Sequence, residues 1–130
     1  MLDTDTCAFV LRGPSPGLAA NLQRVPLQQQ VMSVVTLAEL LHGVRISSKR
    51  NANRSAVDAL LGHLRVLDWQ PAAAVHYADI RADLRRAGTM IGANDLMIAA
   101  HARSLEAAIV TNNVRDFGRV KGLRVENWLA

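Results

Sequence analysis

The chain alternates short apolar runs with longer segments in which apolar residues recur every three or four positions. The short runs predict strands at residues 1–3, 30–35, 66–69, 107–111 and 123–128. The segments of helical period predict helices at residues 6–12, 18–25, 36–47, 55–65, 72–87 and 91–105. Strands that alternate with helices indicate a mostly parallel sheet covered on both faces, so we expect an α/β fold.

Glycine, proline and polar clusters mark where these segments end. Gly13 and Pro14 stop the first helix, and residues 47–54 are expected to form a polar turn. Residues 112–122 are expected to form a loop before the last strand. With 130 residues and no long linker or internal repeat, the chain is predicted to form one domain, residues 1–130.

The composition is typical of a globular protein from a reducing compartment. The hydrophobic share is 50% and the charged share is 20%, which excludes a disordered chain. Cys7 is the single cysteine, so no internal disulfide can form. No apolar run approaches the roughly 20 residues of a membrane span, and the N-terminus carries acids where a signal peptide carries basic residues. We therefore predict a soluble, cytoplasmic protein without a membrane segment.

The chain carries a formal net charge of +4, and nearly all of its basic residues are arginine. Lys49 and Lys121 are the only lysines among 15 basic residues. Because guanidinium groups match phosphate geometry, a polyanionic partner such as nucleic acid is one explanation. A solvated arginine-rich surface is the other, and charge alone does not decide between them.

One carboxylate lies beside the apolar face of the helix predicted at 91–105. Ile98, Ala99 and Ala102 follow Asp95 at helical spacing, so Asp95 falls on or beside the stripe that faces a core. A charge at the edge of a buried face costs free energy unless another group compensates it. Asp95 is therefore expected to have a partner.

Three further acids stand where predicted strands end. Asp3 ends the first strand, Glu39 lies at the start of the helix after the second, and Asp116 follows the fourth. In a parallel sheet these carboxyl ends share one edge, where ligands bind. We expect the three acids to gather there with Asp95. A hard divalent cation such as Mg²⁺, which prefers oxygen ligands, would compensate their mutual repulsion.

Helix capping is the alternative explanation for each of these acids. Thr36 and Glu39 have the spacing of a capping box. The other acids or their neighbours are candidate caps of their own helix or turn: Asp3 or Asp5, Asn94 or Asp95, and Asp116. Capping alone does not explain why four acids occupy comparable positions in the predicted topology.

Four stretches resemble the PIN-domain ribonucleases, and most closely the VapC-type toxins of bacterial toxin–antitoxin pairs. They cover nearly the whole chain in the family's order: LDTD, SVVTLAELLHG, GANDLMIAAHA and VTNNVRDFGRVKGLRVENW. The resemblance implies a Rossmann-like three-layer α/β/α sandwich with a central parallel sheet of about five strands. It also implies an Mg²⁺- or Mn²⁺-dependent endoribonuclease that forms homodimers. The implied partner is a small cognate antitoxin whose C-terminal segment covers the acidic pocket.

By matching motif, the resemblance assigns catalysis and metal binding to four acids: Asp3, Glu39, Asp95 and Asp116. Thr111 and Asn112 match the polar position next to the site. The family usually has more apolar residues before its first aspartate than this chain has before Asp3, so Asp5 is kept as a reserve ligand. A metal-activated water would then attack the RNA backbone in line and leave a 5′-phosphate and a 3′-hydroxyl.

Arginines are expected to follow the backbone of the RNA. The first candidates share one predicted helix: Arg81, Arg85 and Arg86. A second group flanks the polar turn: Arg45, Arg50 and Arg54. For every one of them, a place on a solvated surface is the alternative.

Two other functions fit parts of the sequence. LDTDT also resembles the first motif of haloacid-dehalogenase-like phosphatases, in which Asp3 would be the nucleophile and Asp5 the acid/base. Cys7 stands where that motif has threonine or valine, and no well-placed lysine follows, which counts against a phosphatase. A PIN domain that binds RNA or a partner without catalysis is the second alternative.

Overall fold

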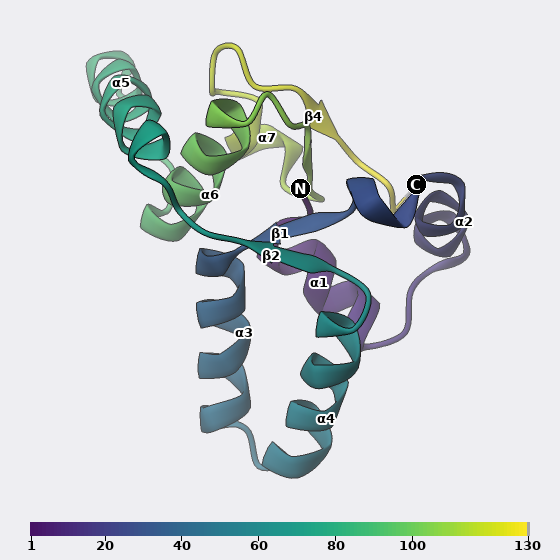
Figure 1. The fold of residues 1–130 in the computed structure, drawn as a ribbon. Helices are drawn as coiled ribbons and strands as arrows, with labels where there is room; N and C mark the ends of the chain where they lie inside the picture. Colours follow the sequence, from purple (N-terminus) through teal and green to yellow (C-terminus); the bar gives the residue numbers. More distant parts are fainter. Residues whose placement is uncertain (130) are drawn as a thin grey trace.

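The computed structural model describes residues 1–129, in which helices alternate with short strands (Figure 1). The helices are α1 (Thr4–Leu11), α2 (Pro16–Arg24), α3 (Val34–Ile46), α4 (Arg50–Leu61), α5 (Pro71–Ala87), α6 (Ala93–Ser104) and α7 (Val114–Phe117), with a 3-10 turn at Leu27–Gln29. The strands are β1 (Val31–Ser33), β2 (Arg65–Leu67), β3 (Ile109–Val110) and β4 (Val125–Glu126). None of the described helices has the length and apolar character needed to cross a bilayer. The predicted domain, residues 1–130, extends one residue beyond the described part, and its extent stays a prediction.

All strand pairs are parallel, as predicted, and the N-terminal segment joins the two pairs into one array. β1 pairs with β2, and β3 pairs with β4. Leu2 forms an isolated parallel bridge with Val110, and its N–H donates to the carbonyl oxygen of Val31 at 2.9 Å. Residues 1–129 thus contain four strands, and the strand predicted at residues 1–3 is reduced to one bridge because α1 begins directly after Asp3.

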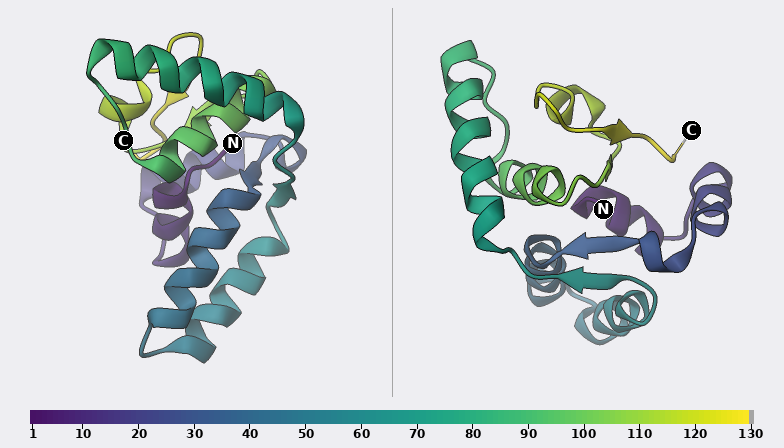
Figure 2. Two further views of the ribbon diagram at one scale, coloured as in Figure 1. Left: turned by 90° about the vertical axis from the view of Figure 1, so that its left-hand side faces the viewer. Right: turned by 45° about the horizontal axis from the view of Figure 1, so that its top comes forward.

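Successive residues of the array pack into two cores, one on each face. Met1, Val31 and Ile109 belong to a core that also contains residues of α5, α6 and α7. Their chain neighbours pack on the opposite face with residues of α1, α2, α3 and α4: Leu2, Met32 and Val110. This alternation is that of strands covered on both sides. In Figures 1 and 2, α3 and α4 lie on one side of the strands and α5, α6 and α7 on the other, so the predicted α/β/α layering is confirmed.

Helix α3 begins two residues earlier than predicted. Ser33 is its N-cap, and the serine Oγ accepts a hydrogen bond from the N–H of Val35 at 3.1 Å. The strand predicted at 30–35 therefore ends at Ser33. Thr36 is buried inside the helix, so the capping box predicted for Thr36 and Glu39 is wrong. The serine hydroxyl already satisfies the start of the helix, and it outweighs the strand preference of the β-branched residues that follow.

Helices also occupy two segments that the sequence predicts to be irregular. α4 begins inside the turn predicted at 47–54, where the Oγ of Ser47 accepts a hydrogen bond from Nδ2 of Asn53 at 2.6 Å. α7 forms inside the loop predicted at 112–122 and is capped by Asn113. Side-chain hydrogen bonds of this kind let short polar segments enter a helix, and α7 carries one of the predicted site residues.

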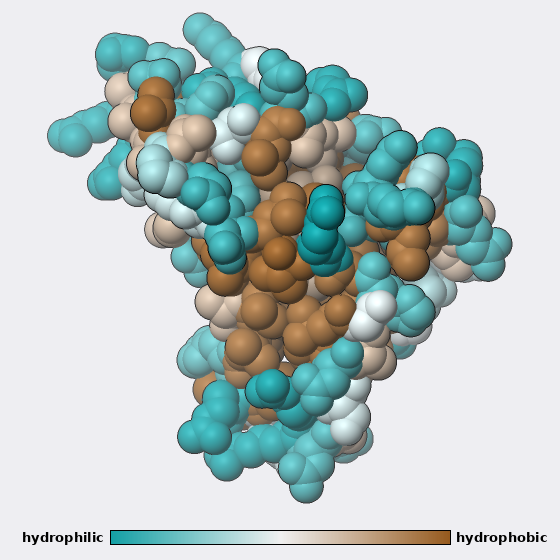
Figure 3. Space-filling model, in the orientation of Figure 1, coloured by the Kyte–Doolittle hydropathy of each residue, from teal (hydrophilic) through white to brown (hydrophobic). Residues whose placement is uncertain are grey.

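An apolar band crosses the face seen in Figure 3. It extends over β1 and β2 and into the space between α3 and α4, and polar side chains border it on all sides. β2 is an edge strand, because its single pairing partner is β1. Contiguous exposed apolar surface beside a free strand edge is typical of a protein interaction site.

Candidate active site

Asp3 is a buried carboxylate that hydrogen bonds from two residues, Thr6 and Thr111, hold in place. Its side chain is 2% exposed, and its Oδ1 accepts a hydrogen bond from the N–H of Thr6 at 2.9 Å. Its Oδ2 accepts a hydrogen bond from Oγ1 of Thr111 at 2.5 Å. Burial raises the pKa of Asp3, although the hydrogen bonds from Thr111 and Thr6 oppose that rise. Asp3 is thus the N-cap of α1, one of the two caps predicted for this helix, and also points to the edge where β3 ends.

Glu39 lies in the second turn of α3 and is tied to the start of α1. Its Oε1 accepts a hydrogen bond from Oγ1 of Thr4 at 2.5 Å, and this hydroxyl also lies 3.2 Å from Oγ1 of Thr36. Thr4 and Thr36 were not among the predicted site residues. The position of Thr4 directly after Asp3 was the only available signal, because the contact joins residues 35 positions apart.

Asp95 is the third residue of α6, half-buried, and not a cap. The N-cap is Gly92, and α6 has no side-chain hydrogen bond at its start, so the caps predicted at Asn94 or Asp95 are wrong. Among the described residues, none donates a hydrogen bond to the Asp95 carboxylate. A glycine at the cap position costs only a few tenths of a kcal/mol relative to a polar cap, which leaves Asp95 free for another role.

The pKa of Asp95 is raised, in part by other acids nearby. Burial, the largest cause, together with nearby negative charges raises this pKa from 3.8 to about 6. The charges that contribute come from four other acids: Asp3, Glu39, Asp5 and Asp116. The three other predicted acids and the reserve residue therefore lie near enough to Asp95 for their charges to raise its pKa, as expected for residues at one edge of a parallel array.

Asp116 sits in α7 and has two partners of its own. Its Oδ2 accepts a hydrogen bond from Nδ2 of Asn113 at 3.0 Å, and Nη1 of Arg119 lies 3.4 Å from its Oδ1. Asn113, rather than Asp116, caps the helix, so the cap predicted at Asp116 is wrong. The guanidinium of Arg119 already compensates part of the Asp116 charge, unlike the charge of Asp95.

The three supporting residues differ in how they relate to the acids: Thr111 contacts Asp3, Asp5 acts through its charge, and Asn112 points elsewhere. Thr111 is buried and holds Asp3, and its Oγ1 also accepts from the N–H of Asn113 at 2.9 Å. Asp5 is exposed in the first turn of α1, and its charge contributes to the raised pKa values of Asp3 and Asp95. Asn112 is exposed, and its Oδ1 accepts from Nδ2 of Asn127 at 3.4 Å, so its side chain is engaged away from the acids.

The arginines proposed to follow RNA lie exposed on α5, and two of them have intramolecular partners. Nη1 of Arg81 donates to the hydroxyl of Tyr77 at 3.0 Å, and Nη2 of Arg86 lies 2.6 Å from Oδ1 of Asp83. Arg85 is exposed in the last turn of the helix. Their contact with RNA stays a prediction. In the second group, Nε of Arg54 pairs with Asp58 at 3.1 Å.

The acids fit a hard cation by their chemistry more than by their present spacing. Carboxylate oxygens are the preferred ligands of Mg²⁺ and Mn²⁺, and after burial the charges of other acids are the remaining cause of the raised pKa of Asp95. Within residues 1–129, however, no three aspartate, glutamate, histidine or cysteine side chains are close enough together to hold one ion. Joint coordination by three of these carboxylates therefore requires them to move closer together.

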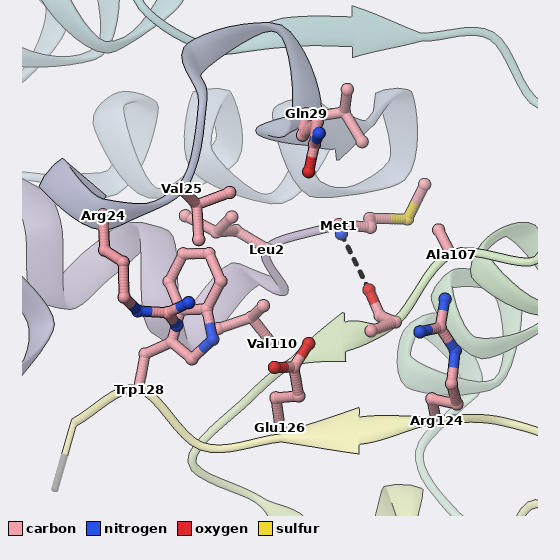
Figure 4. A pocket seen from close by; sticks show the side chains of 12 residues that line it. Met1, Leu2, Arg24, Val25, Gln29, Ala107, Val110, Arg124, Glu126 and Trp128 are labelled. Atoms are coloured by element: carbon pink, nitrogen blue, oxygen red, sulfur yellow. Dashed lines mark hydrogen bonds between the residues drawn. The ribbon is translucent and has the colours of Figure 1, made fainter. Parts of the chain in front are cut away.

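A separate cavity is lined by the N-terminal residues, by the chain leading into β1, and by the segments that contain β3 and β4 (Figure 4). It has a volume of about 350 Å³, and Met1, whose backbone nitrogen donates to the carbonyl of Ala108 at 2.8 Å, lies in its wall. Trp128 also lines it, and its buried Nε1 has no hydrogen-bond partner among the described residues. None of the predicted site residues lines this cavity, so it is separate from the acidic cluster.

Comparison with known proteins places the chain beside one family. A family model described as PIN domain matches residues 2–123. The tRNA(fMet)-specific endonuclease VapC of Shigella flexneri is 42% identical over 130 residues, covering 98% of this chain and 96% of the relative. The protein of the same name from Salmonella typhimurium is 38% identical over 128 residues, with the same shares covered.

Solved structures agree with the sequence relatives. DNA-bound VapBC from Salmonella typhimurium superposes with a TM-score of 0.93 at 38% identity, covering 98% of this chain and 96% of that one. VapBC2 from Rickettsia felis, bound to a DNA fragment from their promoter, gives a TM-score of 0.92 at 35% identity, covering 98% and 97%. The similarity spans the acids described above as well as both helical layers.

Proposed function

This chain belongs to the PIN domain family and, within it, to the VapC group, and from that membership we propose that it is an endoribonuclease toxin of a toxin–antitoxin pair. The observation that carries the proposal is that four other acids lie near Asp95, whose pKa is raised by burial and by their negative charges. Relatives named as endonucleases of tRNA(fMet) support RNA as the substrate class. The phosphatase alternative loses support, because both oxygens of Asp3 are engaged and the side chain is buried.

We further propose that Mg²⁺ or Mn²⁺ binds at the acidic cluster, held by Asp3, Asp95 and Asp116 with Glu39 beside them. When bound, such an ion would stabilise the negative charge that develops on the scissile phosphate and would lower the pKa of the attacking water. Thr111 keeps Asp3 in a fixed orientation by its hydrogen bond to Oδ2. Thr4 holds Glu39, so that its second carboxylate oxygen can orient the attacking water and accept its proton. In-line attack then leaves a 5′-phosphate and a 3′-hydroxyl.

Cleavage by the purified protein tests this function. Free of any antitoxin, the chain is expected to cut single-stranded or loop RNA with Mg²⁺ or Mn²⁺, and to stop when EDTA is added. Asp95→Asn should lower the rate by more than about 100-fold, since even loss of an outer-shell partner commonly costs about 10–100-fold. Asp79→Asn, at an exposed aspartate on α5, is the matched control and should keep the wild-type rate. Cleavage that persists in EDTA contradicts the proposal, and RNA binding without cleavage supports the non-catalytic alternative.

An antitoxin is the proposed protein partner, since the solved relatives are VapBC complexes. A groove of about 480 Å³ adjoins Glu39 between α1, α3 and α4, and its wall is largely apolar: Ala8, Leu11, Leu40, Val44, Ala56 and Val57. We expect an antitoxin segment to occupy this groove and to place an Arg or Lys against the acids. Its inhibition of cleavage should weaken at high salt. Equal inhibition after its basic tail residues are replaced by Ala contradicts this assignment.

A second copy of the chain is the occupant that we propose for the apolar band over β1, β2, α3 and α4. The family resemblance implies a homodimer, and burying an exposed apolar band is favourable. Sedimentation of the purified toxin should give the mass of a dimer. A monomer at concentrations well above those used for cleavage contradicts the assignment.

A further inference from the structure

A second, smaller pocket adjoins Glu39 on the side away from the apolar groove. It has a volume of about 280 Å³ and is lined by Val35, Ala38, Glu39, His42 and Asn94. Four of these residues come from one face of α3, where positions three, four and seven apart align. The fifth, Asn94, is the second residue of α6 and directly precedes Asp95 in the chain.

The lining combines an apolar floor with two free polar side chains. Val35 and Ala38 contribute the apolar atoms, and Glu39 belongs to the acidic cluster. His42 and Asn94 are exposed, and within residues 1–129 no hydrogen bond holds either side chain. The amide of Asn94 offers a donor and an acceptor side by side, and His42 offers a flat ring.

These groups match an unpaired nucleobase better than a protein segment. Sequence-dependent recognition of RNA uses flat side chains that stack on splayed bases and amides that pair with base edges. His42 is the one ring system lining either pocket next to Glu39 among the described residues. The groove on the other side of Glu39 is mainly apolar and larger, which suits a protein segment. Glu39 lines the smaller pocket and also belongs to the acidic cluster. A base in this pocket would therefore lie next to a phosphate bound at the acids.

We propose that this pocket receives one unpaired base of the RNA substrate beside the scissile phosphate, with His42 stacking on the base and Asn94 reading its edge. The proposal rests on the ribonuclease function proposed above. His42 and Asn94 are then specificity-determining residues, whereas the acids perform the reaction. Cleavage selectivity at one position next to the cut site should depend on these two side chains.

The experiment compares His42→Ala and Asn94→Ala with two matched controls. Asn51→Ala removes the same side chain from the second residue of α4, and His63→Ala removes an exposed histidine outside both pockets. Each variant cleaves four RNA oligonucleotides that differ in the base on one side of the cut site, and four that differ on the other side. The affinity for uncut RNA is measured by fluorescence anisotropy in EDTA, so that binding is read without catalysis.

We expect the wild type and both controls to prefer one base at one of the two positions. Asn94→Ala should reduce that preference to less than about threefold, and His42→Ala should weaken RNA affinity by about fivefold or more, the scale of a lost base stack. All variants should keep the wild-type melting temperature, because the substituted side chains are exposed. Unchanged preference and affinity in both variants overturn the proposal, as does a wild type without any base preference.

Two further outcomes separate this proposal from its premise. If the wild type binds RNA in EDTA but never cleaves it, the ribonuclease function is contradicted. The RNA affinity of His42→Ala then still shows whether the pocket binds a base. If both variants keep RNA preference and affinity but lose inhibition by the antitoxin, the pocket belongs to the protein partner and the proposal is overturned.

Discussion

Asp3 and Asp95 belong to the same acidic cluster, but the protein holds them in different ways. Asp3 is buried, caps α1 and accepts hydrogen bonds from Thr6 and Thr111. Asp95 is half-buried, receives no hydrogen bond from the described residues and is surrounded by other negative charges. Burial raises the pKa of both carboxylates, but within residues 1–129 only Asp3 has hydrogen-bond donors that hold it in place.

The difference shows how a fold can remain stable with several negative charges close together. Hydrogen bonds to Asp3 offset much of the cost of burying it and fix its direction at the strand edge. Asp95 is left without such compensation, so a cation that arrives there gains the full attraction of an unpaired carboxylate. In the proposed metal site, the fixed acid would define the place of the ion and the unpaired acid would provide affinity for its positive charge.

The largest expected effect comes from removing the donor to Asp3. Thr111→Val keeps the shape of the side chain but leaves Oδ2 of Asp3 without its buried partner. The free energy of unfolding should fall by about 1–3 kcal/mol, and RNA cleavage by about 10–100-fold. Urea denaturation and initial cleavage rates measure the two effects. Thr89→Val, at a threonine whose hydroxyl does not touch the acids, is the control, and an equal loss in both variants contradicts the role of Thr111.

A direct contrast of the two acids gives the next largest effect. Asp3→Ala removes an N-cap, so the metal-free protein should lose about 1–2 kcal/mol of unfolding free energy. Asp95→Ala removes only a repelled charge and should leave that free energy unchanged or higher. Both variants are compared with wild type by urea denaturation in EDTA. Equal destabilisation by the two substitutions contradicts the contrast.

The pH dependence of stability provides a smaller effect. The folded pKa of Asp95 is raised from 3.8 to about 6, so its contribution to stability is present below pH 3.8 and is lost as pH rises through 6. Between pH 4 and pH 7, metal-free wild type should therefore lose stability relative to Asp95→Asn, which cannot titrate there. Exposure to solvent keeps the effect modest, because Asp95 is only half-buried. A constant difference between the two proteins across this range contradicts the raised pKa.

The sequence predicts the layers of this fold well because the two cores follow from simple periodicity. Met1 and Leu2 on the N-terminal segment, like Val31 and Met32 on β1, enter opposite cores as alternation requires. Boundaries are harder to predict where local preferences compete. Ser33 starts α3 within a β-branched run that also favours a strand.

The acids themselves could be predicted from topology, but their partners could not. Asp3 was expected either to cap α1 or to face the site, and it does both. Glu39 was expected to join the acids, with a capping box as the alternative, but nothing in the sequence indicated that it accepts a hydrogen bond from Thr4, 35 residues away. Such a contact exists only once α1 and α3 have packed together, and no local pattern encodes it.

The melting temperature with and without metal tests the central claim most directly, namely that Asp95 is the unpaired carboxylate of a cation site. Ions that bind the native state stabilise it by mass action, by about 2.7 kcal/mol at 100 times the dissociation constant. Wild type and Asp79→Asn should therefore melt several degrees higher in saturating Mn²⁺ than in EDTA, and Asp95→Asn should lose most of that increase. An Asp95→Asn protein that keeps the full metal-dependent increase contradicts the account.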